Sequence, residues 1–210
     1  MSTGRRLLLV VSALLAARAV AQDEPMAWRI GVAYGRATQQ FFPLDDPNYR
    51  YENQGVKLLF NLPLLVEGAF SLELQLGPAI YIAQHRLVNP YYVKPSDGPD
   101  YLAQRARFTQ EQALREHALN VGLLLRYRVA GPLSLFVLGS IGPMIIDTPT
   151  ERLASGLAFS DVIACGVGVR AGRFLLEVGP GLRHASNANT RKPNSGLNSV
   201  SVDVGLSFSP

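Results

Sequence analysis

A histidine and a serine near the C-terminal end of the chain, His184 and Ser186, have the residue types and the spacing of a nucleophilic pair. Residues i and i+2 of a β-strand project from the same face with Cα atoms about 6.6 Å apart, so the two side chains can meet. A serine hydroxyl becomes a nucleophile when a neighbouring imidazole takes its proton, and its attack on a carbonyl gives a covalent acyl intermediate. The pair therefore indicates acyl-transfer chemistry.

A hairpin places further polar side chains around this pair. Pairing across a symmetric loop puts Asn198 opposite His184 and on the same face. An amide in that position can hold the imidazole in one orientation. Asn187 and Asn194 lie in the connecting loop and can donate hydrogen bonds to an oxyanion. The candidate catalytic residues are therefore His184, Ser186 and Asn198, and the candidate oxyanion or substrate contacts are Asn187 and Asn194.

The elements that must position these residues are β-strands. From residue 28 onward, apolar side chains alternate with small or polar ones, which is the period of a strand that has two unlike faces. The predicted strands are Trp28–Gly35, Tyr51–Leu62, Ser71–Ile82, Leu119–Arg128, Leu133–Ile146, Phe159–Arg170, Arg173–Ser186 and Asn198–Phe208. His184 and Ser186 fall on the apolar parity of their strand, so the candidate site belongs to the apolar face.

The number, length and connections of the strands predict an all-β fold, an eight-stranded antiparallel transmembrane β-barrel of the outer membrane. Tight turns at Ala130–Pro132 and Ala171–Gly172 alternate with longer polar connections, as in outer-membrane barrels. The longer connections are Ala37–Arg50, Gln84–Gln112, Asp147–Ala158 and Asn187–Gly196. The other parity carries charges that we expect to form a paired network inside the barrel: Arg29, Glu73, Arg126, Arg128, Arg170, Glu177, Arg183 and Asp203.

The position of His184 along its strand predicts its depth in a membrane. It follows the Ala171–Gly172 turn by 12 residues, which in a strand tilted near 45° corresponds to a height of about 28 Å. The apolar band of such barrels is about 25 Å tall. The candidate site is therefore expected near the boundary of the outer leaflet.

The N-terminus has the features of a secretory signal peptide over residues 1–21, which leaves residues 22–210 for the barrel domain. Arg5 and Arg6 precede a short apolar stretch, and Ala19-Val20-Ala21 has the small residues of a cleavage site. Without this segment the chain has 17 basic and 16 acidic residues, so no basic surface predicts nucleic-acid binding. The single cysteine, Cys165, excludes an intramolecular disulfide.

Two short stretches, His184-Ala185-Ser186-Asn187-Ala188 and Lys192-Pro193-Asn194-Ser195-Gly196-Leu197-Asn198, resemble the lipid A 3-O-deacylase family, the PagL-type acyloxyacyl hydrolases. The resemblance implies an esterase in the outer membrane of a Gram-negative bacterium. It would remove the 3-O-linked hydroxyacyl chain of lipid A, the lipid part of lipopolysaccharide, without a cofactor. It also implies that Ser186 is the nucleophile, that His184 is the base, and that Asn187 and Asn194 lie near the oxyanion. Asn198 departs from the family pattern, which has an acidic residue at this position.

Two other functions fit the same strands. A non-catalytic outer-membrane barrel would use its long loops to bind a ligand or another surface, and it would not need His184, Ser186 and Asn198 to converge. A soluble secreted barrel would enclose an apolar ligand, and it would turn the apolar parity inward. The membrane interpretation predicts outward side chains at Leu176, Val178, Leu182, Val202 and Leu206. A metal site at His85 or His117 is not expected from the spacing of neighbouring ligands, and the sequence is compatible with a homodimer.

Overall fold

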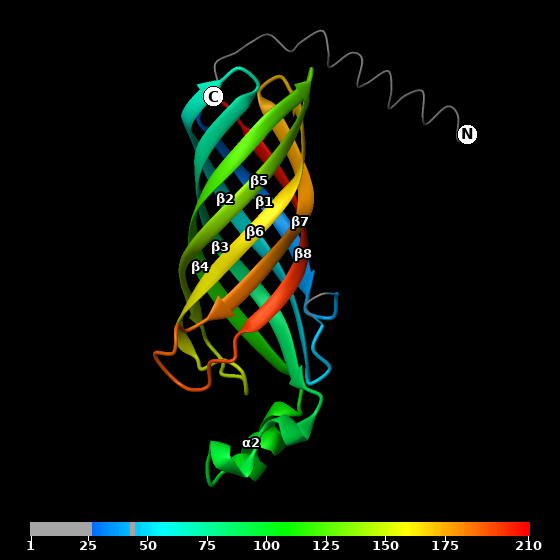
Figure 1. The fold of residues 1–210 in the computed structure, drawn as a ribbon, viewed down its shortest axis with the longest axis vertical. Coiled ribbons are helices and arrows are strands. Elements are labelled where there is room, and N and C mark those ends of the chain that lie inside the picture. The colour runs from blue at the N-terminus through cyan, green and yellow to red at the C-terminus, as the bar shows by residue number, and fades with distance from the viewer. Residues whose placement is uncertain (1–26, 43–44) are drawn as a thin grey trace, which may run out of the picture.

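The structure is a computed structural model that describes residues 27–42 and 45–210. Within these residues eight antiparallel strands close into one barrel, in which each strand pairs with the next and β1 pairs with β8 (Figure 1). The strands are β1 (Arg29–Thr38), β2 (Tyr49–Glu67), β3 (Phe70–Leu87), β4 (Gln112–Ala130), β5 (Leu133–Ile146), β6 (Gly156–Ala171), β7 (Phe174–Ser186) and β8 (Leu197–Phe208). The predicted all-β barrel is confirmed, whereas the predicted signal peptide lies outside the described residues.

The outer wall of the barrel is apolar. The five side chains chosen from the sequence as a test of the outward parity are all exposed, from 39% for Val178 to 58% for Val202. Large apolar side chains of the other strands, such as Ile30, Val121 and Val137, are exposed in the same way. Such a wall suits hydrocarbon rather than water. The orientation excludes the soluble barrel that would enclose an apolar ligand.

The interior holds ion pairs among most of the residues predicted for it, but Arg128 is exposed at the turn end, where its guanidinium donates to the Gly68 carbonyl. Arg126 bonds to Glu73 at 3.0 Å and to Glu177 at 2.7 Å, and all three side chains are almost fully buried. Further pairs join Arg29 with Glu73, Arg183 with Glu116, and Lys57 with Asp203. A buried charge is tolerated when it is paired and hydrogen-bonded, which is how these side chains can lie inside the barrel.

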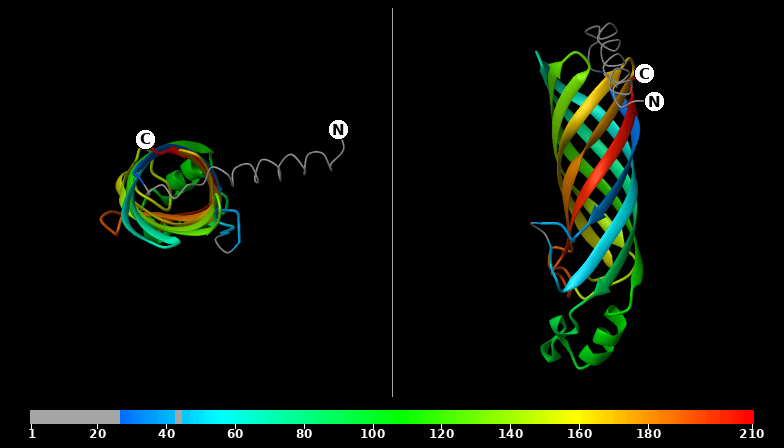
Figure 2. Two further views of the ribbon diagram at one scale, coloured as in Figure 1. Left: turned by 90° about the horizontal axis from the view of Figure 1, so that it is seen from above. Right: turned by 90° about the vertical axis from the view of Figure 1, so that its right-hand side faces the viewer.

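Short turns lie at one end of the barrel and longer loops at the other (Figures 1 and 2). The turns β2–β3, β4–β5 and β6–β7 each pass through a glycine with positive φ, namely Gly68, Gly131 and Gly172. The opposite end carries the loops after β1, β3, β5 and β7. His184 and Ser186 are at the end of β7 that faces these loops.

Toward the loop end the strands extend beyond their predicted limits. β4 begins at Gln112 rather than Leu119, and β3 continues to Leu87, inside the predicted loop Gln84–Gln112. In these extensions apolar side chains point inward, and the buried cluster there includes Tyr49, Tyr51, Leu114, Met144, Ile146, Leu153 and Leu197. The apolar side chains thus move from the outer to the inner face where the wall leaves the hydrocarbon layer. Because of this change, a search for one continuous alternating pattern did not detect these parts of the strands.

The remainder of the β3–β4 connection is helical, which the sequence did not predict. It contains the short 3-10 helices η1 (Pro90–Tyr92) and η2 (Pro95–Asp97) and the α-helix α2 (Tyr101–Phe108). Val93 and Phe108 pack on Leu87 at the end of β3 to form a small separate core. Among the described residues, no helix combines the length and the apolar character needed to cross a membrane.

Candidate active site

The β7–β8 hairpin brings His184 and Asn198 together on the outer wall. They are direct partners in the strand register, as predicted, and His184 Nδ1 lies 2.7 Å from Asn198 Oδ1. Because an amide oxygen accepts but does not donate, Nδ1 carries the proton and Nε2 keeps a free lone pair. The contact therefore leaves the imidazole in the tautomer that a general base requires.

Ser186 lies two residues beyond His184 on the same face and is half-buried opposite Phe159 of β6. Among the described residues, no hydrogen bond joins Ser186 to His184. Catalytic hydrogen bonds are often long in the absence of substrate and tighten when it binds. Both side chains project from one face of β7, so a rotation of either one changes the distance between them.

Gly196 makes room for the imidazole. Its φ is +74°, and a Cβ at this position would lie 2.6 Å from His184 Cε1 and 3.3 Å from Nε2. The edge of the ring that carries Nε2 therefore lies against the backbone at the start of β8, while Nδ1 faces Asn198. Any residue larger than glycine would have to displace the ring or the backbone.

The two loop asparagines shape the connection between β7 and β8. The Asn187 backbone N–H donates to Asn194 Oδ1 at 2.7 Å, and Asn187 Nδ2 donates to the carbonyls of Arg191 and Pro193. Asn194 Nδ2 donates to Asn189 Oδ1 at 3.0 Å. The Asn187 amide is thus engaged within the loop, whereas the Asn194 amide has a second N–H available. Their contact with an oxyanion stays a prediction.

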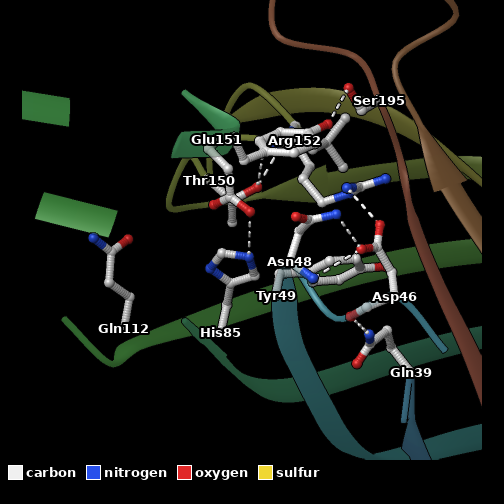
Figure 3. Close-up of polar contacts among 12 residues, drawn as sticks. Gln39, Asp46, Asn48, Tyr49, His85, Gln112, Thr150, Glu151, Arg152 and Ser195 are labelled. Carbon is white, nitrogen blue, oxygen red and sulfur yellow. Dashed lines mark hydrogen bonds and ion pairs between the residues drawn. The ribbon is translucent and has the colours of Figure 1, made fainter. Parts of the chain in front are cut away.

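A second loop, between β5 and β6, fixes the backbone of the first. The carbonyl of Arg152 accepts from the N–H groups of Ser195 and Gly196, and Arg152 Nε donates to the Gly196 carbonyl at 2.9 Å. The same guanidinium bonds to Asp46 at 3.0 Å and lies 4.3 Å over the ring of Tyr49 (Figure 3). Arg152 therefore links Gly196, on which the His184 ring packs, to Asp46 and Tyr49 at the loop end of the barrel.

Below Arg152 a buried polar pair supports the same loop. His85 Nε2 of β3 lies 3.2 Å from Glu151 Oε1, and both side chains are almost completely buried (Figure 3). His85 also stacks on Tyr49. The candidate site is therefore supported by contacts that link three loops at the open end of the barrel.

Sequence reasoning missed Arg152 and also Asp161, the residue that faces His184 from the other side. The β6–β7 register pairs Asp161 directly with His184. The tight Ala171–Gly172 turn would have given this pairing by the same count that gave Asn198, because the turn is nearly symmetric. No comparable signal exists for Arg152, since its contacts depend on how two irregular loops meet.

The closed strands, the apolar wall and the charged lumen define an outer-membrane β-barrel with a polar site on its lipid-facing side. The model of the lipid A 3-O-deacylase family (PagL) matches residues 97–207, more than half of the chain and the part that carries this site. The chain belongs to this family and is a protein of the Gram-negative outer membrane.

A solved structure supports the fold. The crystal structure of the outer membrane enzyme PagL has 15% sequence identity and a TM-score of 0.56, and the match covers 84% of this chain and 97% of that one. Neisserial surface protein A has 8% identity and a TM-score of 0.46, over 87% of this chain and 97% of the other. No curated protein sequence matches the chain.

Proposed function

We propose that the protein is a carboxylic ester hydrolase that removes the 3-O-linked hydroxyacyl chain of lipid A by a Ser-His mechanism. Family membership supports the deacylase activity. The observation that carries the mechanism is the 2.7 Å contact of His184 Nδ1 with Asn198 Oδ1, beside Ser186 on the lipid-facing wall. The contact leaves a free imidazole nitrogen near a serine where acyl chains would lie.

In this mechanism Ser186 is the nucleophile. Its Oγ attacks the ester carbonyl of the acyl chain while His184 Nε2 takes the hydroxyl proton. The tetrahedral intermediate collapses as the bond to the 3-oxygen of the sugar breaks, and the imidazolium returns the proton to that oxygen. A water molecule, deprotonated by the same nitrogen, then attacks the acyl-serine and releases a 3-hydroxy fatty acid. The enzyme ends in its starting state.

The loop between β7 and β8 would stabilise the oxyanion. The second amide N–H of Asn194 is the donor we assign to the developing negative charge, and Asn187 holds Asn194 in place through the 2.7 Å backbone contact. A donor fixed before the reaction is worth more than a mobile one, because it costs no reorganisation when the charge forms.

The location of the site suits a membrane lipid better than a soluble ester. Exposed apolar side chains, among them Leu157, Ile163 and Leu182, surround the pair on β6 and β7. They can contact acyl chains while the polar loops above remain in water. A substrate that has its ester at the boundary of the leaflet would reach Ser186 without leaving the membrane.

Mass spectrometry of lipid A tests this proposal directly. The full-length protein is expressed in a Gram-negative host without such an activity, next to Ser186→Ala. We expect the parent to give lipid A that is lighter by one 3-hydroxyacyl chain, and the Ser186→Ala variant to give unmodified lipid A. The variant should fold normally, because removal of a small half-buried hydroxyl has little effect on stability.

A matched control is Ser201→Ala on β8, whose hydroxyl bonds to Asp203 within the barrel. This control should keep the activity of the parent. Unmodified lipid A from a folded parent protein would support the alternative of a non-catalytic barrel with binding loops. Full activity of Ser186→Ala would exclude the serine mechanism.

A further inference from the structure

An acidic residue on the outer wall faces the candidate base. Asp161 of β6 is the direct cross-strand partner of His184, on the side opposite Asn198. Side chains of directly opposed residues in an antiparallel pair have Cβ atoms about 5 Å apart. His184 therefore lies in a row across three strands, with a carboxylate on one side and an amide on the other.

The surroundings of Asp161 on the outer wall are apolar. Along β6 it lies on the apolar parity, between Phe159 and Ile163, and across the β5–β6 pair it faces Ile141. Its Oδ1 is shielded from solvent and makes no hydrogen bond within the described part of the chain. A charged side chain among apolar ones on a membrane-facing wall is costly, so its presence calls for a partner or a function.

The reaction creates a need for such a charge. Asn198 can orient the imidazole through Nδ1, but a neutral amide does not compensate the positive charge that His184 acquires when it takes the proton of Ser186. A carboxylate close to the ring favours that imidazolium, and more strongly in a low dielectric than in water.

We propose that Asp161 is the acidic positioning residue of this site, which stabilises the His184 imidazolium from β6 while Asn198 fixes the ring from β8. No proton passes to Asp161; it acts through its charge on His184. In this arrangement Asn198 on β8 orients the ring, and Asp161 on β6 supplies the negative charge. The inference deepens the proposed function, on which it rests for the identity of the base.

Other charged groups near the ring leave this assignment intact. Among the described residues of β8, the partner Asn198 is neutral, and the wall residues next to it on that face are apolar. From the β7–β8 loop, Arg191 reaches back over Gly156 and donates to the Leu157 carbonyl at 3.3 Å, which places its guanidinium at the start of β6 rather than beside Asp161.

The coupling is tested first by NMR, independently of any substrate. The full chain is labelled in its three histidines, folded in detergent micelles and titrated, and the His184 resonance is assigned by its loss in His184→Gln. We expect Asp161→Asn to move the titration midpoint of His184 to lower pH, since the variant loses the charge that favours the imidazolium. Asp161→Ser provides the same test if the asparagine variant does not fold.

Glu67→Gln is the matched control, because Glu67 is an exposed carboxylate at the turn end of β2 and its loss changes the net charge equally. It should leave the His184 titration unchanged. An unchanged midpoint in Asp161→Asn would overturn the proposal, whatever the activity of the protein. A shifted midpoint with a parent that leaves lipid A intact would retain the coupling and reject only the deacylase function.

Deacylation then measures the consequence. We expect Asp161→Asn to lower kcat by about tenfold or more, to move the acidic limb of the pH profile to lower pH, and to be rescued by Asp161→Glu. Asn198→Asp in the Asp161→Asn background should also restore part of the rate, because it returns a carboxylate to the ring. A loss of rate with an unmoved pH profile and no rescue by either carboxylate would show a merely structural role.

Discussion

At the scale of single residues, the site depends on how one imidazole is held. Asn198 contacts Nδ1, Gly196 lies under the opposite edge, and Asp161 faces the ring across the sheet. None of these neighbours is a nucleophile or a base itself. Each of them restricts the orientation or the charge of His184, so that a substitution of a neighbour should change the rate without changing the fold.

The amide of Asn198 is expected to act mainly in the chemical step. Asn198→Ala removes the partner of Nδ1 and frees the tautomer and the rotation of the ring, so we expect kcat to fall by about 10- to 100-fold. Asn198→Glu keeps an acceptor for Nδ1 and should match or exceed the parent. The measurement is steady-state deacylation of purified lipid A in detergent. If both variants keep the rate of the parent, Asn198 has no role in the reaction.

Gly196 gives a second test at this scale. Gly196→Ala introduces a Cβ that would meet His184 Cε1 at 2.6 Å, and it also strains a backbone with φ of +74°. The strain should cost about 1 kcal/mol, whereas displacement of the ring should nearly abolish deacylation. Gly68→Ala separates the two effects, because Gly68 has φ of +57° with nothing within 4 Å.

The Gly68→Ala control should therefore lose a similar amount of stability and keep its activity. Unfolding in urea and deacylation are measured on both variants. Equal activity in the two variants would mean that the contact between Gly196 and His184 does not matter.

At the scale of elements, the strands and the β7–β8 hairpin could be predicted from the sequence, and the loops could not. β5 has the predicted limits, and the pairing of His184 with Asn198 follows from the symmetry of one hairpin. Alternation predicts strands wherever one face is apolar. The alternating pattern did not predict the start of β4 near Gln112, because above the membrane the outer face becomes polar and the apolar side chains point inward.

The contacts of the loops could not be predicted from an alternating pattern, because they are not periodic. The helical segment after β3 and the bonds of Arg152 to the β7–β8 loop arise from irregular segments that meet in space. The part of the site that could be predicted is therefore the part on strands. The support of the site, which comes from two other loops, required the structure.

The β5–β6 loop is expected to control the order of the β7–β8 loop. Arg152→Ala removes the bonds to Gly196 and Asp46 and the contact with Tyr49. We expect faster tryptic cleavage after Arg191 in folded protein and a deacylation rate reduced by about tenfold, since a site that moves by an ångström loses much of its activity.

The matched control for this loop is Arg105→Ala. Its guanidinium lies over Tyr91 and Tyr101 in the β3–β4 connection and donates to Val93. It should leave cleavage at Arg191 unchanged. Slow cleavage and full activity in Arg152→Ala would show that the loop is ordered without this residue.

At the scale of the whole molecule, one barrel presents two different environments to its wall. Over most of its height, apolar side chains point outward and ion pairs lie in the lumen. At the loop end apolar side chains also gather in the interior, around the Arg183–Glu116 pair and beneath polar loops. The candidate site lies where the two regions meet, which lets a polar reaction centre stand beside apolar side chains without being buried in either region.

This division predicts how the cost of a charge on the wall varies with height. Val178→Arg, in the middle of β7, places a guanidinium on an exposed apolar position of the wall, and it should destabilise the barrel by about 2–4 kcal/mol in lipid vesicles. Ile145→Arg, next to the last residue of β5 at the loop end, should cost about 0–1 kcal/mol, because the charge can reach water there. Both side chains are exposed on the wall, at 39% and 57%, so burial in the core does not explain a difference. Reversible unfolding in guanidinium chloride, followed by tryptophan fluorescence from vesicles, measures both values. Equal costs at the two heights would mean that Val178 does not lie in the hydrocarbon layer, and the placement of His184 at its outer boundary would then lose its basis.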